Sequence, residues 1–401
     1  MADKNVNWDS LPVEIVTQIL IRLPIKSIII STSVCKTWKS LIQNPTFIPT
    51  HLHHSINNNN HHHLLFRLCQ DGKEIYALHN DDDDDFTEHT RFDFPFHAVN
   101  DNTFRVVGTC NGLVCLSDDL IVNKVHHFFL WNPCVRKFVK LPYPNLTYKT
   151  HGGVSASIGF GFDAKTNDYK VVRMVNLPNP NSNSKNLRRD RPKVEVYTLS
   201  TGEWRMVTAA LPPICTVLGL QQVAFVNGAL HWLAFRWTDD DLIYHFVLVF
   251  ELEDEVFREI QLPELPGYEN TYDLDGPVSV YKNCLALFKK RYYRHYRIDF
   301  FENKEGSSDQ NIWVMKEYGV ASSWTKVFTI TDQDPDMPFA IGFRRNGEFV
   351  LQVESGQLIS VDVGNQKMKD LGISSDKNAF VDSYVESLVL LDKAANGAVT
   401  Y

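Results

Sequence analysis

The apolar positions at the start of the chain recur at helical spacing. Ile15, Ile19 and Leu23 fall on one face of a predicted helix, because they are separated by four residues each. Pro12 suits the first turn of such a helix, and Pro24 ends it. The pattern therefore predicts a short amphipathic helix between the two prolines.

Two further short helices are predicted before Pro45. The second begins after Pro24 and the third stops at Asn44, and their apolar positions are Ile28, Ile29, Ile30, Val34, Trp38, Leu41 and Ile42. Three short helices cannot bury all of these side chains among themselves, because surface outweighs volume in a short chain. Either the rest of this chain or a second protein must cover the surplus apolar surface.

Two biased tracts follow the predicted helices. The sequence reads SINNNNHHH from Ser55 to His63, and five aspartates run from Asp81 to Asp85. Such tracts lack the apolar side chains that a core needs, so both are predicted to be solvated loops, with residues 53–63 as a polar linker. Six histidines lie between His51 and His63, but a selective metal site needs fixed geometry. We expect no metal site there.

Beyond Phe104 the hydrophobic pattern changes to short β-branched runs separated by turns. Hairpin turns flanked by apolar runs recur about every 60 residues, which is the spacing of a repeat architecture. They occur at Gly112, Asp168, Gly228, Cys284 and Gly347. A second hairpin follows each one, so the repeat is a four-stranded unit, as in the blade of a β-propeller. Five such units are predicted between Phe104 and Gly372.

The two ends of this region supply a possible sixth unit. HLLFRLCQDGKEIYALH carries its own Asp71-Gly72 turn, and YVESLVLL from Tyr384 is predicted to be a strand without a hairpin of its own. Pairing of these segments would close the ring and remove the exposed sheet edge. The predicted fold is therefore mainly β, with three N-terminal helices followed by a propeller of about six blades in residues 64–401.

Composition narrows the functional classes. The 401 residues carry a net charge of −8, which gives no general attraction for nucleic acid or for an anionic membrane surface. The start of the sequence does not resemble a signal peptide, and no run of about eighteen apolar residues occurs. The seven cysteines include no C-x-x-C pair, as expected of reduced thiols in the cytoplasm or nucleus.

Two motifs imitate catalytic sites. Gly108-Thr109-Cys110-Asn111-Gly112 looks like a nucleophile elbow with cysteine, and the run from Gly159 to Ala164 fits a relaxed dinucleotide fingerprint. Both motifs require a helix to follow, whereas a strand follows the first and a turn the second. We expect Cys110 to lie in a hairpin and no catalytic residue or cofactor site at either motif. The tryptophans at 131, 204, 232, 313 and 324 are predicted to pack between blades.

The N-terminal residues resemble the plant F-box motif in order and spacing. The resemblance is carried by Leu11-Pro12, Glu14, Ile19-Leu20, Arg22-Leu23-Pro24, Lys26-Ser27, Val34-Cys35-Lys36, Trp38, Leu41-Ile42, Pro45, Phe47 and His51-Leu52. Ile30 and Ser31 stand where the family usually has a basic residue and then an aromatic one. The resemblance implies that residues 8–52 bind the Skp-type adaptor of a cullin-based ubiquitin ligase.

This resemblance assigns the adaptor-binding surface to particular residues. They are Leu11, Pro12, Ile15, Ile19, Leu20, Leu23, Pro24, Ile28, Val34, Cys35 and Trp38. The repeated units, especially LWNPCVRKF and VEVYTLSTGEW, are similar to the F-box-associated, kelch-like domain of plant F-box proteins.

Two functional hypotheses follow from this organisation. In the first, the chain is a non-catalytic substrate receptor: the adaptor and cullin join at the helices, and the propeller holds an unidentified target protein for ubiquitination. Holding reactants together raises their effective concentration, so the receptor itself needs no bond-making residue. In the alternative, the chain is a propeller enzyme or a glycan- or ligand-binding protein, and the helices only cap the ring. That alternative predicts a deep polar pocket on the ring axis.

Overall fold

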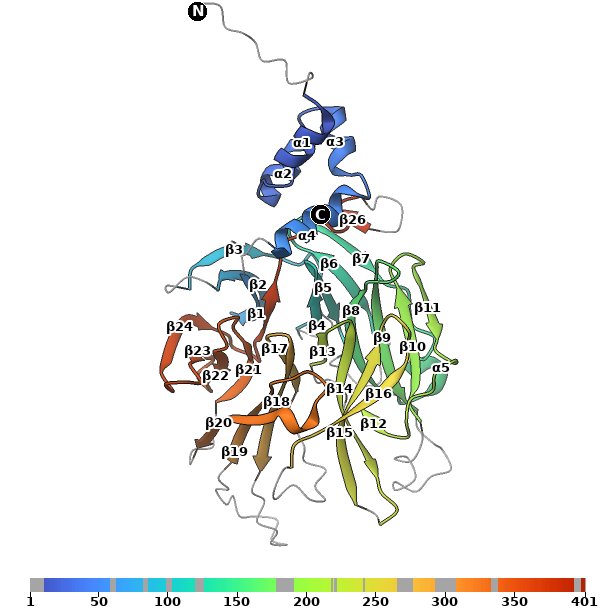
Figure 1. Ribbon diagram of the computed structural model, residues 1–401, viewed down its shortest axis with the longest axis vertical. Helices are drawn as coiled ribbons and strands as arrows, with labels where there is room; N and C mark the ends of the chain where they lie inside the picture. Colours follow the sequence, from blue (N-terminus) through green and yellow to red (C-terminus); the bar gives the residue numbers. More distant parts are fainter. Residues whose placement is uncertain are drawn as a thin grey trace, which may run out of the picture.

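The computed structural model describes most of the chain. The described residues are 11–57, 63–81, 86–98, 103–119, 126–177, 191–217, 219, 222–240, 242–264, 277–292, 308–332, 338–392 and 398–400. They form a ring of β-sheets with a group of helices standing on one side (Figure 1).

Among the described residues, four helices precede the ring, where the sequence predicted three. They are α1 (Val13–Leu20), α2 (Ile25–Ser31), α3 (Lys36–Ile42) and α4 (Phe47–Asn57). Pro24 precedes α2 as predicted, whereas Pro12 lies one residue before α1 and not within its first turn. The Cys35 Sγ caps α3 by accepting the Trp38 N–H at 3.4 Å. Helix α4 runs into the segment predicted to be a linker, so only residues 58–62 separate it from the first strand, and they lie outside the described residues.

The strands form six sheets, as the sequence predicted (Figure 1). The first three blades in chain order contain β4 (Arg105–Cys110), β5 (Leu113–Ser117), β6 (Phe128–Asn132) and β7 (Lys137–Lys140); β8 (Ser155–Asp163), β9 (Asp168–Asn176), β10 (Lys193–Thr198) and β11 (Glu203–Met206); and β12 (Thr216–Val217), β13 (Ala224–Val226), β14 (Ala229–Trp237), β15 (Ile243–Glu251) and β16 (Phe257–Gln261).

The remaining three blades complete the ring. They contain β17 (Val278–Tyr281), β18 (Cys284–Tyr292), β19 (Ser308–Met315) and β20 (Trp324–Asp332); β21 (Phe339–Phe343), β22 (Phe349–Gln352), β23 (Gln357–Val361) and β24 (Met368–Ser374); and β25 (Phe380–Tyr384), β1 (His63–Gln70), β2 (Lys73–Asn80) and β3 (Glu88–Phe92). Three short elements lie outside this pattern: α5 (Tyr148–His151), the 3-10 turn η4 (Ala321–Ser323) and β26 (Ala398–Thr400), which adds a fifth strand beside β7.

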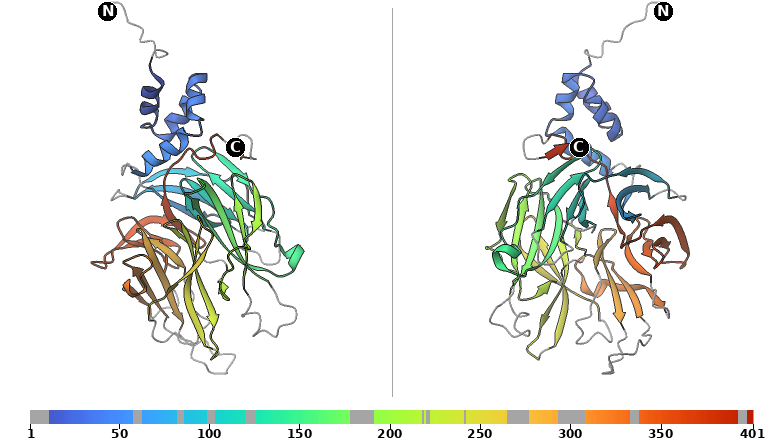
Figure 2. Two further views of the ribbon diagram at one scale, coloured as in Figure 1. Left: turned by 45° about the vertical axis from the view of Figure 1, so that its right-hand side comes forward. Right: turned by 180° about the vertical axis from the view of Figure 1, so that it is seen from behind.

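The ring closes by pairing strands from its two ends. Strand β25 is antiparallel to β1, with His63 opposite Tyr384 and Arg67 opposite Phe380. Neighbouring inner strands then contact one another around the whole ring, in the order β25, β4, β8, β13, β17 and β21. Both views in Figure 2 show the blades packed around a common centre. The closing sheet therefore takes one strand from the C-terminal part and three from the N-terminal part.

The position of the closing strand differs from the sequence prediction. The strand ends at Tyr384, where it was expected to begin, and residues 385–391 are not a strand. Their apolar side chains, including Leu388 and Leu390, are buried against the helices and the first two blades. These apolar residues therefore pack between the helices and the blades and do not form a strand. The periodicity of a short apolar run does not distinguish a strand from such a packed segment.

The hairpin turns and tryptophans agree with the sequence prediction. Asn111 and Gly112 both have positive φ, of 51° and 79°, which suits a tight hairpin turn. Four of the five tryptophans are buried and Trp313 is partly buried. Trp204 Nε1 donates to the Pro142 carbonyl of the preceding blade at 2.8 Å, and Trp324 Nε1 donates to Gln261 at 3.0 Å. These indoles therefore join neighbouring blades as well as filling the core.

Among the described residues, no helix is long and apolar enough to cross a lipid bilayer.

Candidate functional site

Helices α1 to α3 project away from the ring, and α4 lies between them and the sheets (Figures 1 and 2). Phe47, Ile48 and Leu52 of α4 are buried in a core that also contains Leu388 and Leu390. Lys26 Nζ adds a polar contact by donating to Thr90 Oγ1 of β3 at 3.2 Å. The ring thus covers α4 and leaves much of α1 to α3 facing solvent.

The eleven residues predicted to bind an adaptor fall into three groups by exposure. Pro12, Ile15, Ile19, Pro24 and Val34 are exposed; Leu11, Leu23, Cys35 and Trp38 are partly buried; Leu20 and Ile28 are fully buried. Leu20 and Ile28 lie in the core of the helical group, so they can support a binding surface but cannot touch a partner in this conformation. Binding by the other nine stays a prediction.

Helices α1 and α2 and the turn after α2 leave five large aliphatic residues exposed to solvent. This exposed aliphatic set is Val13, Ile15, Ile19, Ile30 and Val34, and each of these residues is 47–70% exposed. Ile15 and Ile19 are one helical turn apart on α1 and, with Leu23, line a shallow groove of about 460 Å³. Large exposed apolar side chains gathered on one element mark an interaction surface more often than isolated ones do. Val13 and Ile30 were not among the predicted site residues, although their helical spacing could have indicated them.

The two positions that depart from the family pattern have separate environments. Ile30 is 70% exposed, whereas Ser31 is buried. The Ser31 hydroxyl donates to the Ser27 carbonyl of its own helix at 2.7 Å, so its hydrogen bond is satisfied. Serine is therefore accommodated in the fold at this position.

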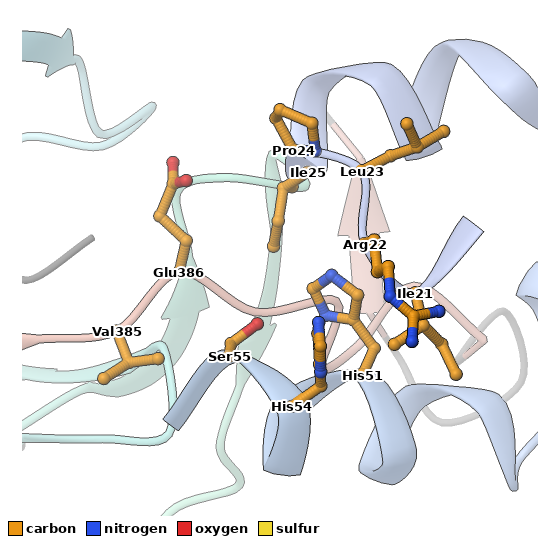
Figure 3. A pocket seen from close by; sticks show the side chains of 10 residues that line it. All are labelled: Ile21, Arg22, Leu23, Pro24, Ile25, His51, His54, Ser55, Val385 and Glu386. Atoms are coloured by element: carbon orange, nitrogen blue, oxygen red, sulfur yellow. The ribbon is translucent and has the colours of Figure 1, made fainter. Parts of the chain in front are cut away.

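A cleft of about 440 Å³ lies where the helices meet the ring (Figure 3). Arg22, Leu23 and Pro24 line one side, His51 and His54 project from α4, and Glu386 stands on the segment after β25. Burial lowers the pKa of His51 to about 4, against a hydrogen bond to the Leu23 backbone that raises it. His51 is therefore neutral at physiological pH and packs as part of the junction.

A second cavity lies on the ring axis and holds a perturbed carboxyl group. It measures about 120 Å³ and is lined by residues from the inner strands of five blades, among them Asp382, Thr109 and Ser279. Thr109 Oγ1 donates to Asp382 Oδ2 at 2.8 Å, and burial raises the pKa of Asp382 to about 6. The cavity is smaller than the roughly 300–1,000 Å³ of small-molecule sites. It has room for a few waters, which weakens the alternative of a deep ligand pocket.

The two motifs that imitate catalytic sites are structural. Cys110 is the last residue of β4, and burial raises the pKa of its thiol, which is the opposite of an activated nucleophile. The run from Gly159 continues as β8 to Asp163, and a turn follows it where a dinucleotide site would need a helix. Neither motif has the geometry of the site that it imitates.

Comparison with known proteins agrees with this architecture. The F-box domain matches residues 8–50, and the F-box associated beta propeller domain matches residues 66–391. The chain belongs to the F-box proteins with an F-box-associated propeller. F-box protein At3g07870 of Arabidopsis thaliana is 30% identical, with 90% of this chain and 87% of the relative covered. F-box protein CPR1 of the same plant is 25% identical, with 95% and 89% covered.

Solved structures give a weaker likeness. The chain is similar to the Dos1 propeller at 10% identity and a TM-score of 0.36, with 77% of this chain and 69% of that chain covered. Membership of the F-box family supports a substrate-receptor role in general, and the F-box domain implies adaptor binding in general.

Proposed function

We propose that this F-box protein is the substrate-recognition subunit of a Skp-cullin-F-box ubiquitin ligase. Its helices bind the Skp-type adaptor, and through it a cullin, while the propeller binds a target protein. No bond-making residue is needed in this chain, because the complex acts by holding the target near a ubiquitin-conjugating enzyme. We place this activity in the cytoplasm or nucleus, because the cysteine pattern of the sequence is typical of reduced thiols.

One observation carries the proposal. The ring covers α4 but leaves Ile15, Ile19 and Val34 of the F-box about half exposed or more. If the helices only capped the ring, these side chains would be the ones buried against it. At roughly 25 cal/mol for each Å² of apolar surface removed from water, covering the set favours association with a partner. This favours a docking surface over a cap.

The small size of the cavity on the ring axis argues against the alternative, a propeller enzyme or ligand-binding protein. A propeller enzyme or ligand-binding protein would need room for its substrate, and the described residues leave about 120 Å³ around Asp382. The sequence has two long irregular insertions, after Val175 and after Arg291, and loops of this kind commonly carry recognition residues. Both insertions lie mainly outside the described residues.

The proposal is tested by reconstituting the complex in steps. Purified chain is immobilised and offered a cullin with and without a Skp-type adaptor. We expect the cullin to be retained only when the adaptor is present, and neither protein to be retained by Leu23→Asp or Trp38→Ala. Equal recovery of the adaptor by all three chains would contradict the proposal, provided that circular dichroism shows the variants to be folded.

A further inference from the structure

Three side chains with metal-binding atoms meet beside the junction of helices and ring. They are His63, the first residue of β1; His89, in β3; and Glu386, two residues after β25 ends. Their ligand atoms all lie within 4.8 Å of one another, although the residues are far apart in the sequence. We propose that His63, His89 and Glu386 bind a divalent transition-metal ion of the zinc class at the seam that closes the propeller.

The donor set fits such an ion. Zinc binds imidazole nitrogen and carboxylate oxygen at about 2.0–2.2 Å, so its ligand atoms lie about 3.3 Å apart in a tetrahedral site. Two histidines and one glutamate leave one position for water, which is a common arrangement of protein ligands around zinc. Magnesium and calcium prefer oxygen ligands alone and would bind this set poorly.

The side chains need only a small adjustment to reach that geometry. The rings of His63 and His89 are stacked, with centroids 4.4 Å apart and planes 17° from parallel. A shared ion requires one ring to tilt so that its nitrogen points to the common position. His63 is buried at 3% exposure, whereas His89 is exposed and has space to turn. When the ion binds, His89 therefore turns toward it, whereas burial already holds His63 in place.

The backbone places His89 in a special position. In the β2–β3 pairing, Glu88 is opposite His79 and Thr90 is opposite Leu78, so the register skips His89. This is a β-bulge, a feature that redirects a side chain and is enriched beside binding sites. Without the bulge, His89 would take a place in the regular alternation of the strand.

The carboxylate is held as well. Cys134 Sγ donates to Glu386 Oε1 at 3.6 Å. The same sulfur also lies 3.6 Å from the Tyr384 hydroxyl. Groups that hydrogen-bond a metal ligand orient it and strengthen binding. Glu386 thus belongs to a positioned segment, and the ion would join the start of β1, the bulge of β3 and the chain that follows β25. These are the parts of the chain that close the ring, next to the linker from the F-box.

The test titrates Zn²⁺ into the full chain, prepared without a histidine tag and freed of metal with a chelator, by isothermal titration calorimetry. We expect one ion per chain at micromolar affinity or better. His89→Ala and Glu386→Gln should each weaken binding at least about tenfold, as removing a group that supports a metal site does. His53→Ala, an exposed histidine of α4 outside the cluster, should bind as the wild type does.

Two further measurements separate this site from other histidines. Zn²⁺ should raise the melting temperature of the wild type but not of His89→Ala, since a ligand of the folded state stabilises it. Co²⁺ should give the visible absorption of a four-coordinate ion. The proposal is overturned if His89→Ala binds as tightly as the wild type. It is also overturned if binding is absent at 0.1 mM Zn²⁺, or is lost only when His61→Ala and His62→Ala are combined.

Discussion

Arg344 of the fifth blade holds Asp81 of the sixth in a buried pair. Arg344 Nε donates to Asp81 Oδ1 at 2.8 Å, and the Arg345 N–H donates to Asp81 Oδ2 at the same distance. Both side chains are less than a tenth exposed, and the guanidinium lies over the Phe86 ring with 5.0 Å to its centroid. Asp81 thus fastens the N-terminal strands to the blade before them.

Asp81→Ala should destabilise the protein strongly. It leaves the Arg344 guanidinium buried without its carboxylate, and breaking a buried pair in this way typically costs about 3–5 kcal/mol. Asp254→Ala is the matched control, because Asp254 pairs with Lys165 at 2.8 Å with both side chains more than half exposed. Exposed pairs contribute about 0–1 kcal/mol. The free energies of unfolding of the two variants, measured with denaturant, should therefore differ by several kcal/mol. Equal losses would show that Asp81 does not hold the two blades together.

Gly112→Ala should destabilise more than Gly228→Ala. Both glycines occupy hairpin turns with positive φ, of 79° and 74°, so both variants bear the backbone strain of about 1–2 kcal/mol. At Gly112, an added Cβ would also meet the Ser387 hydroxyl and lie 2.8 Å from the Val385 carbonyl oxygen, whereas nothing lies within 4 Å at Gly228. Melting temperatures measure the difference. A Gly228→Ala protein as unstable as Gly112→Ala would show that the contact with residues 385–387 is unimportant.

Removing the closing strand should abolish cooperative unfolding. A chain ending at Ala379 lacks β25 together with the mostly buried residues 385–391, and it exposes the edge of β1. A chain ending at Asp392 lacks only β26, which adds to the outer edge of the first blade, and serves as the control. Calorimetry should give one sharp transition for the control and none for the shorter chain. A sharp transition near the wild-type temperature in the shorter chain would contradict closure by β25.

The carboxyl of Asp382 should make stability depend on pH. Its pKa is about 6 in the folded protein and near the ordinary 3.8 when unfolded, so between these values the folded state holds a proton that the unfolded state has released. Stability from this group is therefore greatest below pH 4 and falls as the pH rises to about 6. Asp382→Asn removes that loss.

The measurement compares the two proteins across pH, because other groups titrate in the same range. His51 and His231 have pKa values lowered to about 4 by burial and act with the opposite sign. The difference in melting temperature between Asp382→Asn and the wild type isolates one group. This difference should be larger at pH 7.5 than at pH 4.5. A difference that does not change with pH would show that folding does not raise the pKa of Asp382.

The repeat pattern predicted most of the fold, because each blade carries its own turn and strand signals. An Asn-Gly pair such as Asn111 and Gly112 predicts a hairpin turn from the local sequence alone. The missed features depend on distant contacts instead. Helix α4 has a mostly polar sequence with Pro49 in its first turn, and its amphipathic signal is weak. Asp81 was expected to be solvated with its four neighbours, and only the position of Arg344, far along the chain, explains its burial.

The candidate site was predicted in part for a similar reason. Helical spacing placed Ile15 and Ile19 together on α1, as observed. Spacing could not show that Leu20 and Ile28 face the helical core, since that depends on how α2 and α3 pack against α1. The cluster of His63, His89 and Glu386 is assembled by ring closure and a bulge. His63 ends the histidine-rich tract in which we expected no metal site, and no local sequence signal links it to His89 or Glu386.

The affinity of the F-box for a Skp-type adaptor tests the central claim most directly. Ile19→Asp places a charge in the exposed aliphatic set, and Ile56→Asp makes the same change on α4, where the isoleucine is 44% exposed against 47% for Ile19. Neither change disturbs a buried residue. Calorimetric titration should show that Ile19→Asp loses at least about 2 kcal/mol of binding free energy, as loss of a buried anchor does, while Ile56→Asp binds as the wild type does. Equal affinity of all three proteins would contradict the claim that α1 to α3 form the docking surface.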